Sequence, residues 1–202
     1  MMRKIERDNT GLMKAGQDLI VAGFAGLSGS RVIIKAKRED LLQWFSEEYL
    51  EMTMARETVE DGLNMDFWKK YGATECEPVG EGGILTAIWN LSGAYETGVE
   101  FALRRIPVAQ ETIEICERFE LNPYRLYSAG CYLLAADNGG QMVQALEEDG
   151  IQAQGIGTVN RGIAREIVGA ESHGYLDRPQ KDELYKVVTL SEAIIIIEQF
   201  HI

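Results

Sequence analysis

A cluster of three glycines and one carboxylate is the part of this sequence best suited to hold a charged ligand. It reads Gly80, Glu81, Gly82, Gly83 and runs directly into an apolar segment with helical spacing. Glycines at the start of a helix let backbone N–H groups face a phosphate or a carboxylate. They also permit a sharp turn that packs a helix closely against a sheet. Because Glu81 would repel a phosphate unless a cation stood between them, the sequence leaves both interpretations open.

Several other residues are candidates for the same ligand site. Arg31 follows Ser28 and Ser30 in a Gly- and Ser-rich connection, which we expect to be a mobile loop, and its guanidinium suits an anion. The alternative for Arg31 is an ordinary surface position. The remaining candidates lie in or beside predicted strands, where glycine is also typical of a bulge: Ser128, Gly130, Gly155 and Gly157.

Few residues in the sequence are suited to metal binding or to covalent catalysis. Glu77 and Glu81 are the candidates for a metal-binding carboxylate pair, although two glutamates beside a turn are usually solvated. His173 and His201 have no Cys, Asp or Glu at metal-ligand spacing, and neither pairs with a Ser or Cys nucleophile. We therefore predict no catalytic residue, and the metal stays unknown.

Composition excludes several classes of protein. The chain has 202 residues, of which 46% are hydrophobic, so one substantial core is expected. Its net charge of -12 disfavours nucleic acid. Three cysteines without a C-x-x-C pair indicate reduced thiols rather than disulfides or zinc. The N-terminus has no signal-peptide pattern, and the isoleucine run near the end is too short to cross a membrane, so we expect a cytoplasmic protein.

Strands and helices must alternate to position the candidates. Neighbouring strands joined by hairpins favour an α+β fold with a mixed, largely antiparallel sheet flanked by helices, not a doubly wound parallel sheet. Strands are predicted at 19–22, 31–36, 98–106, 125–136 and 151–159, followed by a hairpin of 164–170 with 173–176. Helices are predicted at 38–55, at 59–72 ending at a glycine, at 83–96, at 107–119, at 140–149, and at 178–188 with a proline in the first turn.

The end of the chain carries four consecutive isoleucines within 193–202. β-branched residues in such a run favour a strand that is buried on both faces. A terminal apolar strand must be covered by its own sheet or by a partner subunit. This pattern predicts a homo-oligomer.

Six motifs, in order, resemble a known family. They are AGQDLIVAGFAGLSG, GEGGILTAIWNLS, YETGVEFALRRIPV, ICERFELNPYRLYSAGCYLLA, LEEDGIQAQGIGTV and RPQKDELYK. In sequence and spacing they resemble the C-terminal domain of the aminoimidazole ribonucleotide synthetase (PurM-like) superfamily, with the hydrogenase maturation protein HypE the closest in character. The resemblance implies an N-terminal extension at 1–14, the family domain at 15–188 and an apolar extension at 189–202.

The resemblance also implies what this chain lacks. Complete family enzymes resemble one another in an N-terminal domain that supplies most ligands for ATP and magnesium, and 202 residues leave no room for it. We expect a stand-alone version of the C-terminal domain. Pro78 stands where relatives often carry His or Asp, and Ala129 where several carry an acidic residue. The cofactor is therefore unknown, with ATP and magnesium implied only by the resemblance.

Three hypotheses about function follow. The first is a ligand- or partner-binding module without catalysis of its own, acting in metalloenzyme or cofactor maturation by analogy with HypE. The second is half of a split ATP-dependent synthetase or kinase-like enzyme, completed by a separately encoded N-terminal-domain protein. In that case Glu81, the neighbouring glycines and Arg31 would face the phosphates and magnesium. The third is a structural homo-oligomer.

Overall fold

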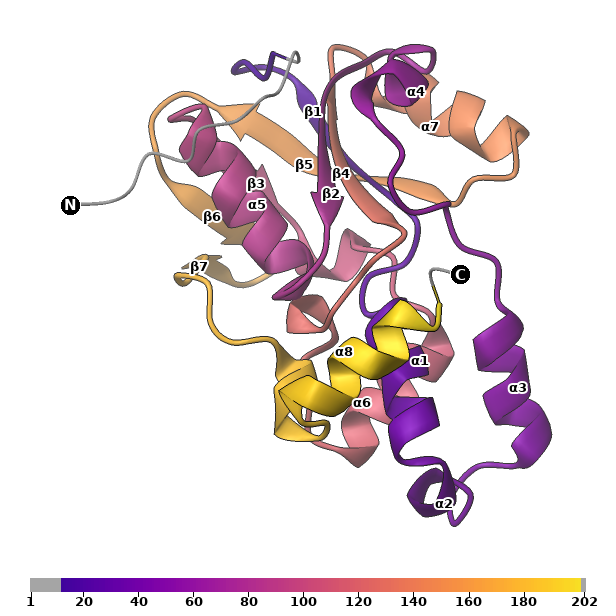
Figure 1. Ribbon diagram of the computed structural model, residues 1–202. Helices are drawn as coiled ribbons and strands as arrows, with labels where there is room; N and C mark the ends of the chain where they lie inside the picture. The colour runs from indigo at the N-terminus through magenta and orange to yellow at the C-terminus, as the bar shows by residue number, and fades with distance from the viewer. Residues whose placement is uncertain (1–11, 201–202) are drawn as a thin grey trace.

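A seven-stranded sheet forms the centre of the molecule (Figure 1), of which the computed structural model describes residues 12–200. The strand order is β2-β4-β1-β5-β3-β6-β7. Every neighbouring pair is antiparallel except β3 with β6, so the predicted mixed, largely antiparallel sheet is confirmed. The strands are β1 Asp18–Ala22, β2 Ala73–Val79, β3 Gly98–Phe101, β4 Cys131–Ala136, β5 Ala153–Asn160, β6 Arg165–Val168 and β7 His173–Tyr175.

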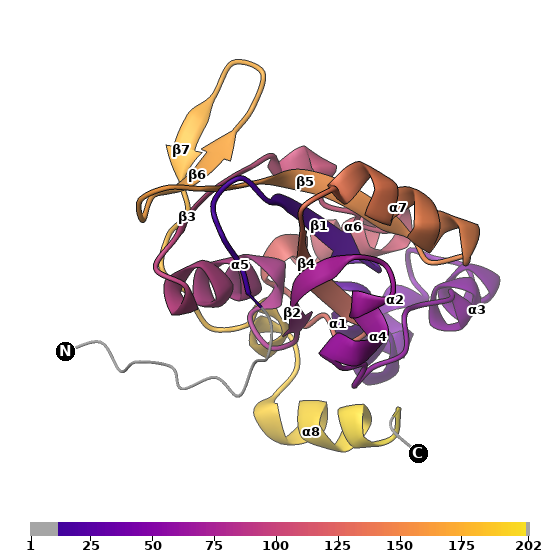
Figure 2. The ribbon, with the colours of Figure 1, turned by 90° about the horizontal axis from the view of Figure 1, so that it is seen from above.

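Helices cover both faces of this sheet and one of its ends (Figures 1 and 2). On one face lies α5 (Gly83–Ala94), and on the other lie α4 (Met65–Lys69) and α7 (Gly139–Glu148). The remaining helices form a third apolar cluster, which we call the end layer. Its members are α1 (Leu27–Ala36), α2 (Arg38–Leu41), α3 (Glu47–Ala55), α6 (Gln110–Arg118) and α8 (Leu190–Glu198), with the short 3-10 helix η3 (Glu183–Lys186).

Alternation along the central strands separates the two faces of the core. In β1, Leu19 and Val21 pack toward α5, whereas Ile20 and Ala22 pack toward α4 and α7. In β4 all six residues are buried, because helices lie on both sides of this strand. The chain between residues 12 and 200 has no helix long and apolar enough to cross a membrane.

The predicted strand at 31–36 is wrong, because these residues lie in α1. The helix starts after Gly26, whose φ of 75° is left-handed. Val32, Ile33 and Ile34 are all fully buried between the sheet end and the other helices. The free-energy difference that arises from β-propensity is small compared with the gain from burying these side chains, so packing decides the conformation. Arg31 therefore projects from a helix rather than from a mobile loop.

The predicted helix at 38–55 is two helices. Its continuous apolar pattern crosses a break between α2 and α3, where Ser46 caps the second helix by accepting the Tyr49 N–H at 3.2 Å. Serine at this position competes with the interior helical hydrogen bonds and favours a new start.

The C-terminal isoleucines form a helix, so the prediction of a strand buried on both faces is wrong. Thr189 and Glu192 close a capping box at the start of α8. Ile196 and Ile197 pack into the end layer, while Ile194 and Ile195 are 48% and 57% exposed. Because a helix has 3.6 residues per turn, some isoleucines of the run face the end layer and the others face solvent.

Other element predictions have mixed outcomes. The helices α5, α6 and α7 and the β6–β7 hairpin are confirmed. The predicted helix at 59–72 is only the five-residue α4, which ends at Lys69, and the left-handed Gly72, with a φ of 92°, lies three residues beyond its end. The predicted helix at 178–188 is only the four-residue η3, with Asp182 as its N-cap. Strand β2, at the edge of the sheet, was not predicted, because Glu75, Glu77 and Pro78 interrupt its apolar pattern.

Candidate functional site

Most of the candidate residues meet at one end of the sheet. Strand β1 is antiparallel to β4 and β5, and β2 is antiparallel to β4. Strands β1 and β2 therefore end at the same end of the sheet at which β4 and β5 begin. Gly80 follows β2, Gly23 follows β1, Gly130 precedes β4 and Gln152 precedes β5. Helix α1, which carries Arg31, starts at the same end. This end of the sheet therefore gathers most of the candidate residues.

The glycine turn at 80–83 is already occupied by a carboxylate of the same chain. The N–H of Gly82 donates to Oδ2 of Asp182 at 2.6 Å. The other oxygen, Oδ1, accepts the N–H groups of Tyr127 at 3.2 Å and Leu184 at 2.8 Å. Asp182 is only 3% exposed, and burial raises the pKa of its carboxyl against the opposing effect of these three donors. The turn thus holds an anion, but an internal one.

The glycines of the turn also meet a steric need. Gly82 and Gly83 have left-handed φ values of 79° and 65°. A Cβ on Gly83 would lie 2.5 Å from the carbonyl oxygen of Tyr124 and 2.8 Å from that of Leu126. The turn therefore allows α5 to start in direct contact with the chain that leads into β4. Its geometry favours the interpretation as a tight turn over that as a phosphate loop.

Ser128 and Gly130 have structural roles at the sheet end. The Oγ of Ser128 accepts the N–H of Gly26 at 2.7 Å and donates to the carbonyl of Leu126 at 2.7 Å, which fixes the start of α1. Gly130 has a φ of 74°, and a Cβ there would lie 2.7 Å from the carbonyl oxygen of Val59. Both residues fasten neighbouring segments together.

Arg31 holds the segment that follows α3. Its Nε donates to the carbonyl of Thr53 at 3.4 Å, and its guanidinium also donates to the carbonyl of Arg56. Burial, together with the charge of Arg56, lowers the pKa of Arg31. Arg31 lies on the wall of a cavity of about 200 Å³ beside Gly130, Tyr127 and Ser28. It therefore positions the chain at 53–59 as well as facing this small cavity.

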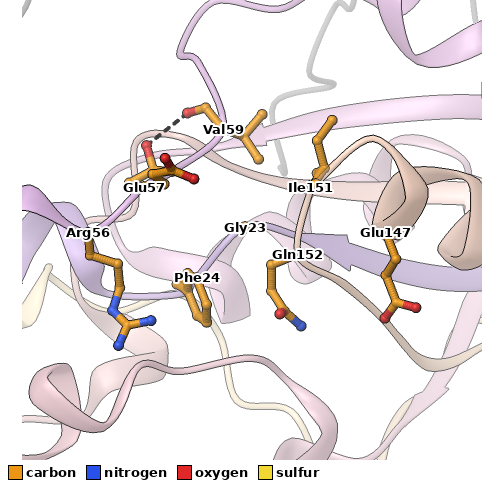
Figure 3. Close-up of a pocket in the computed structure, with 10 residues that line it drawn as sticks. Gly23, Phe24, Arg56, Glu57, Val59, Glu147, Ile151 and Gln152 are labelled. Carbon is orange, nitrogen blue, oxygen red and sulfur yellow. Dashed lines mark hydrogen bonds between the residues drawn. The ribbon is translucent and has the colours of Figure 1, made fainter.

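A larger cavity, of about 470 Å³, lies on the other side of that segment (Figure 3). We call it the Phe24–Arg56 cavity. Three parts of the chain line it: the end of β1, the connection after α3 and the turn from α7 into β5. Figure 3 shows the side chains of Arg56, Phe24 and Gln152 extending to the same side of the ribbon. The lining residues are Gly23, Phe24, Arg56, Glu57, Thr58, Val59, Glu147, Gly150, Ile151 and Gln152.

Arg56 is the polar centre of this cavity. Its guanidinium pairs with Oε1 of Glu111 at 2.6 Å, and its central carbon lies 5.3 Å from the ring centroid of Phe24. The side chain of Glu111 is 5% exposed and that of Arg56 is 36% exposed. Within residues 12–200, the buried Nε of Arg56, Oε2 of Glu111 and Oγ1 of Thr112 have no hydrogen-bond partner. Buried polar atoms are normally paired, but these three have no accessible surface, and of their residues only Arg56 lines the cavity.

The other predicted candidates do not join this site. Gly155 and Gly157 lie in β5 and line a separate cavity. Glu77 lies within β2, and the described chain contains no cluster of three His, Cys, Asp or Glu side chains able to hold a metal ion. His173 pairs with Glu166 at 2.9 Å, and His201 lies outside the described residues.

The three cysteines are free thiols and all are buried. Cys76, Cys116 and Cys131 are free, and burial raises the pKa of each to about 12. A thiol with such a pKa is almost entirely protonated near neutrality and is a poor nucleophile. These residues therefore serve as small core side chains.

Phe24, Arg56, Glu111 and Gln152 were not predicted from the sequence. They come from four separate stretches of the chain, and none carries a recognisable motif. The only local signal is Gly23, which has a φ of 85° and lies so close to Gly130 that a Cβ would be 2.5 Å from its carbonyl oxygen.

The family of the chain follows from its match to a family model. Residues 14–168 match the model described as AIR synthase related protein, C-terminal domain. The chain belongs to this AIR synthase-related family. The matched range ends after β6, whereas α8 lies beyond it and still packs on α1. A search of curated protein sequences finds no significant match.

Several solved structures have a similar fold. E. coli HypE, a hydrogenase maturation protein, superposes with a TM-score of 0.66 at 19% identity, over 91% of this chain and 56% of that one. HypE from a HypE–HypF complex gives 0.60 at 17% identity, over 83% and 54%. Thiamine-monophosphate kinase from Stenotrophomonas maltophilia gives 0.59 at 13% identity, over 79% and 52%. The AIR synthase-related chain thus spans little more than half the length of these proteins.

Proposed function

We propose that this AIR synthase-related protein is a ligand-binding module and that its site is the Phe24–Arg56 cavity. The observation that carries the proposal is the position of Arg56, which lines the cavity beside the ring of Phe24 with a side chain that is 36% exposed and paired with the buried Glu111. Its guanidinium can donate hydrogen bonds to an acceptor in the cavity. A small polar organic molecule that offers an acceptor and covers the ring of Phe24 fits this arrangement.

The same end of the sheet supports the proposal in a second way. Arg31 holds the carbonyl of Arg56, and Gly130 approaches both Gly23 and Val59, so the cavity walls are fixed before a ligand arrives. A preformed wall reduces the entropy cost of binding. The similarity to hydrogenase maturation proteins makes metalloenzyme or cofactor maturation the process in which such a module would act.

A thermal-shift and calorimetric screen of small polar metabolites tests this function. A ligand of this cavity should raise the midpoint of wild-type unfolding. Arg56→Gln should weaken binding by roughly tenfold or more, because a charge-assisted hydrogen bond is lost. Arg161→Gln, an exposed change outside the cavity, is the control. Ligands that bind equally well to wild type and Arg56→Gln would contradict the assignment.

A split ATP-dependent enzyme is the second candidate. Its support is the length of the chain relative to its structural neighbours, one of which is a HypE solved in complex with ATP. A separately encoded N-terminal-domain protein would then complete the site, with Glu81 and the glycine turn facing phosphate and magnesium. Phosphate would have to compete with Asp182 for the Gly82 N–H. ATP turnover that appears only with a co-purified second protein would favour this candidate, and no turnover with such a protein would count against it.

Self-association is the third candidate. The observation that favours it is the open side of α8, where Leu190, Ile194 and Ile195 are exposed. We expect a homo-oligomer formed through this side rather than through a terminal strand.

A further inference from the structure

Two neighbouring cavities form a groove on the face of the sheet where α7 lies. Helix α7 contacts β4, β1 and β5, and β3 and β6 continue the sheet beyond it (Figure 2). The cavities measure about 490 Å³ and about 280 Å³ and share the lining residues Ala102, Arg105 and Val168. We call them together the β3–β6 groove. As far as residues 12–200 show, it has no lining residue in common with the Phe24–Arg56 cavity, so it is independent of the function proposed above.

Two carboxylates mark one end of the β3–β6 groove. Asp18 of β1 and Glu100 of β3 are both in register with Thr158 of β5, so the three side chains lie in one row across the sheet. Oδ2 of Asp18 accepts the N–H of Gly139 at 2.7 Å, whereas the carboxylate of Glu100 has no partner within residues 12–200. Two carboxylates beside a hydroxyl suit a cation that donates several hydrogen bonds, such as an ammonium group.

Two arginines mark the other end. Arg104 and Arg105 follow β3 in the short 3-10 helix η1 (Leu103–Arg105), and they line the smaller cavity together with Gly169 and Ala170, which follow β6. Neither guanidinium has a hydrogen-bond or ion-pair partner in the described chain, although the protein has a net charge of -12. No described carboxylate lines this smaller cavity. This end therefore suits an anionic group, which guanidiniums bind through charge-assisted hydrogen bonds.

Apolar surface separates the two charged ends. Ala102 and Val168 line both cavities, and Ala102 has an extended backbone that continues β3 toward the arginines. An extended chain advances roughly 7 Å from Glu100 to Ala102, and the side chains of Glu100 and Arg105 form no ion pair with each other. A single molecule that contacts both ends therefore needs several bonds between its two charges.

We propose that the β3–β6 groove binds a linear ω-amino acid, in which methylene groups join an ammonium to a carboxylate. The ammonium donates hydrogen bonds to the two carboxylates and to the hydroxyl of Thr158. The carboxylate of the ligand accepts hydrogen bonds from the two guanidiniums, and the methylene groups cover Ala102 and Val168. Each charge of such a ligand meets the opposite charge, whereas a simple cation or a simple anion can use only one end.

Nuclear magnetic resonance of the ¹⁵N-labelled full chain tests the proposal with 4-aminobutyrate and 6-aminohexanoate. At millimolar concentration, at least one of them should shift the amide signals of 100–105, 158 and 168–170 and leave those of 56–59 unchanged. The amine and the carboxylic acid of the same chain length should bind several-fold more weakly. Glycine should also bind more weakly, because its two charges are too close together to reach both ends. The proposal is overturned if neither ω-amino acid shifts these signals, or if glycine or a singly charged match binds as tightly.

Two variants that each remove one charge separate the ends of the groove. Glu100→Gln should lower the affinity for the ω-amino acid to that for the matching carboxylic acid, and Arg105→Gln should lower it to that for the matching amine. Glu117→Gln and Arg178→Gln remove the same charges from exposed positions that line neither cavity, and they should leave the affinity unchanged. Equal losses in the controls would show that the overall charge of the protein, and not this groove, attracts the ligand, and would refute the proposal.

Discussion

Asp182 decides how the glycine turn is interpreted. A carboxylate that accepts three backbone N–H groups in a buried position does for this turn what a bound anion would otherwise do. The partner lies a hundred residues along the chain from Gly82, so the sequence pattern at 80–83 alone could not distinguish a ligand loop from an internally satisfied turn. The sequence indicated that backbone N–H groups of the turn could face a negatively charged group. It did not show that this group is the side chain of Asp182.

Removing this carboxylate should destabilise the protein. We expect Asp182→Ala to lower the free energy of unfolding by about 1–3 kcal/mol, because buried backbone donors lose their acceptor. Urea denaturation measures the change. Asp177→Ala, at an exposed position five residues earlier, should have little effect. A loss no larger than that of the control would show that water replaces the carboxylate without cost.

The same side chain predicts a pH dependence. Burial raises the pKa of Asp182 in the folded state above its ordinary value of 3.8, so the folded chain binds more protons than the unfolded chain between those two values. The contribution of Asp182 to stability should therefore be greatest at acid pH and decline as pH rises through the window above 3.8. Asp182→Asn should flatten this part of the stability profile relative to wild type. Superimposable profiles would exclude a raised pKa.

At the scale of elements, start and stop signals were more informative than residue propensity. The sequence located α5 and α6 because a glycine turn and a proline mark their starts, and Asn122 and Pro123 follow the end of α6. It misassigned α1 and α8, whose isoleucines and valines favour strands in isolation. Both helices pack in the end layer, and burial there is worth more than the difference in propensity.

Patterns within single stretches of sequence also could not predict the whole candidate site. Arg31 and Gly130 were identified from single stretches, and the structure places both at the same end of the sheet. The Phe24–Arg56 cavity, which neither of them lines, depends on how β1, the chain after α3 and the turn before β5 come together. Such a juxtaposition is a property of strand order, which sequence periodicity does not specify.

The capping box should control the stability of α8. We expect Thr189→Ala to accelerate amide hydrogen exchange in α8 about five- to thirtyfold, because the Glu192 N–H loses its acceptor and the box opens. Exchange in α5, which packs on one face of the sheet and not in the end layer, provides the internal control. Uniform acceleration across both helices would mean that α8 unfolds only with the whole chain.

For the molecule as a whole, the net charge and the exposed side of α8 have opposite effects on self-association. A charge of -12 on each copy opposes association, and this repulsion reaches about 30 Å at 0.01 M salt but about 10 Å at 0.1 M. Apolar contact between exposed isoleucines does not weaken with salt. Self-association should therefore increase as ionic strength rises, the opposite of an interface built on ion pairs.

Light scattering across a salt series checks this balance. The wild-type molar mass should lie near 22.6 kDa at low salt and rise toward a multiple of that value at about 0.3 M, where screening is nearly complete. Ile194→Glu combined with Ile195→Glu should keep the mass at the monomer value, because two carboxylates cannot be buried unpaired in an apolar contact. Ile163→Glu adds one carboxylate, half the added charge of the double variant, at another exposed isoleucine and should associate like wild type. If that control also abolishes association, charge alone is responsible and α8 is not the contact surface.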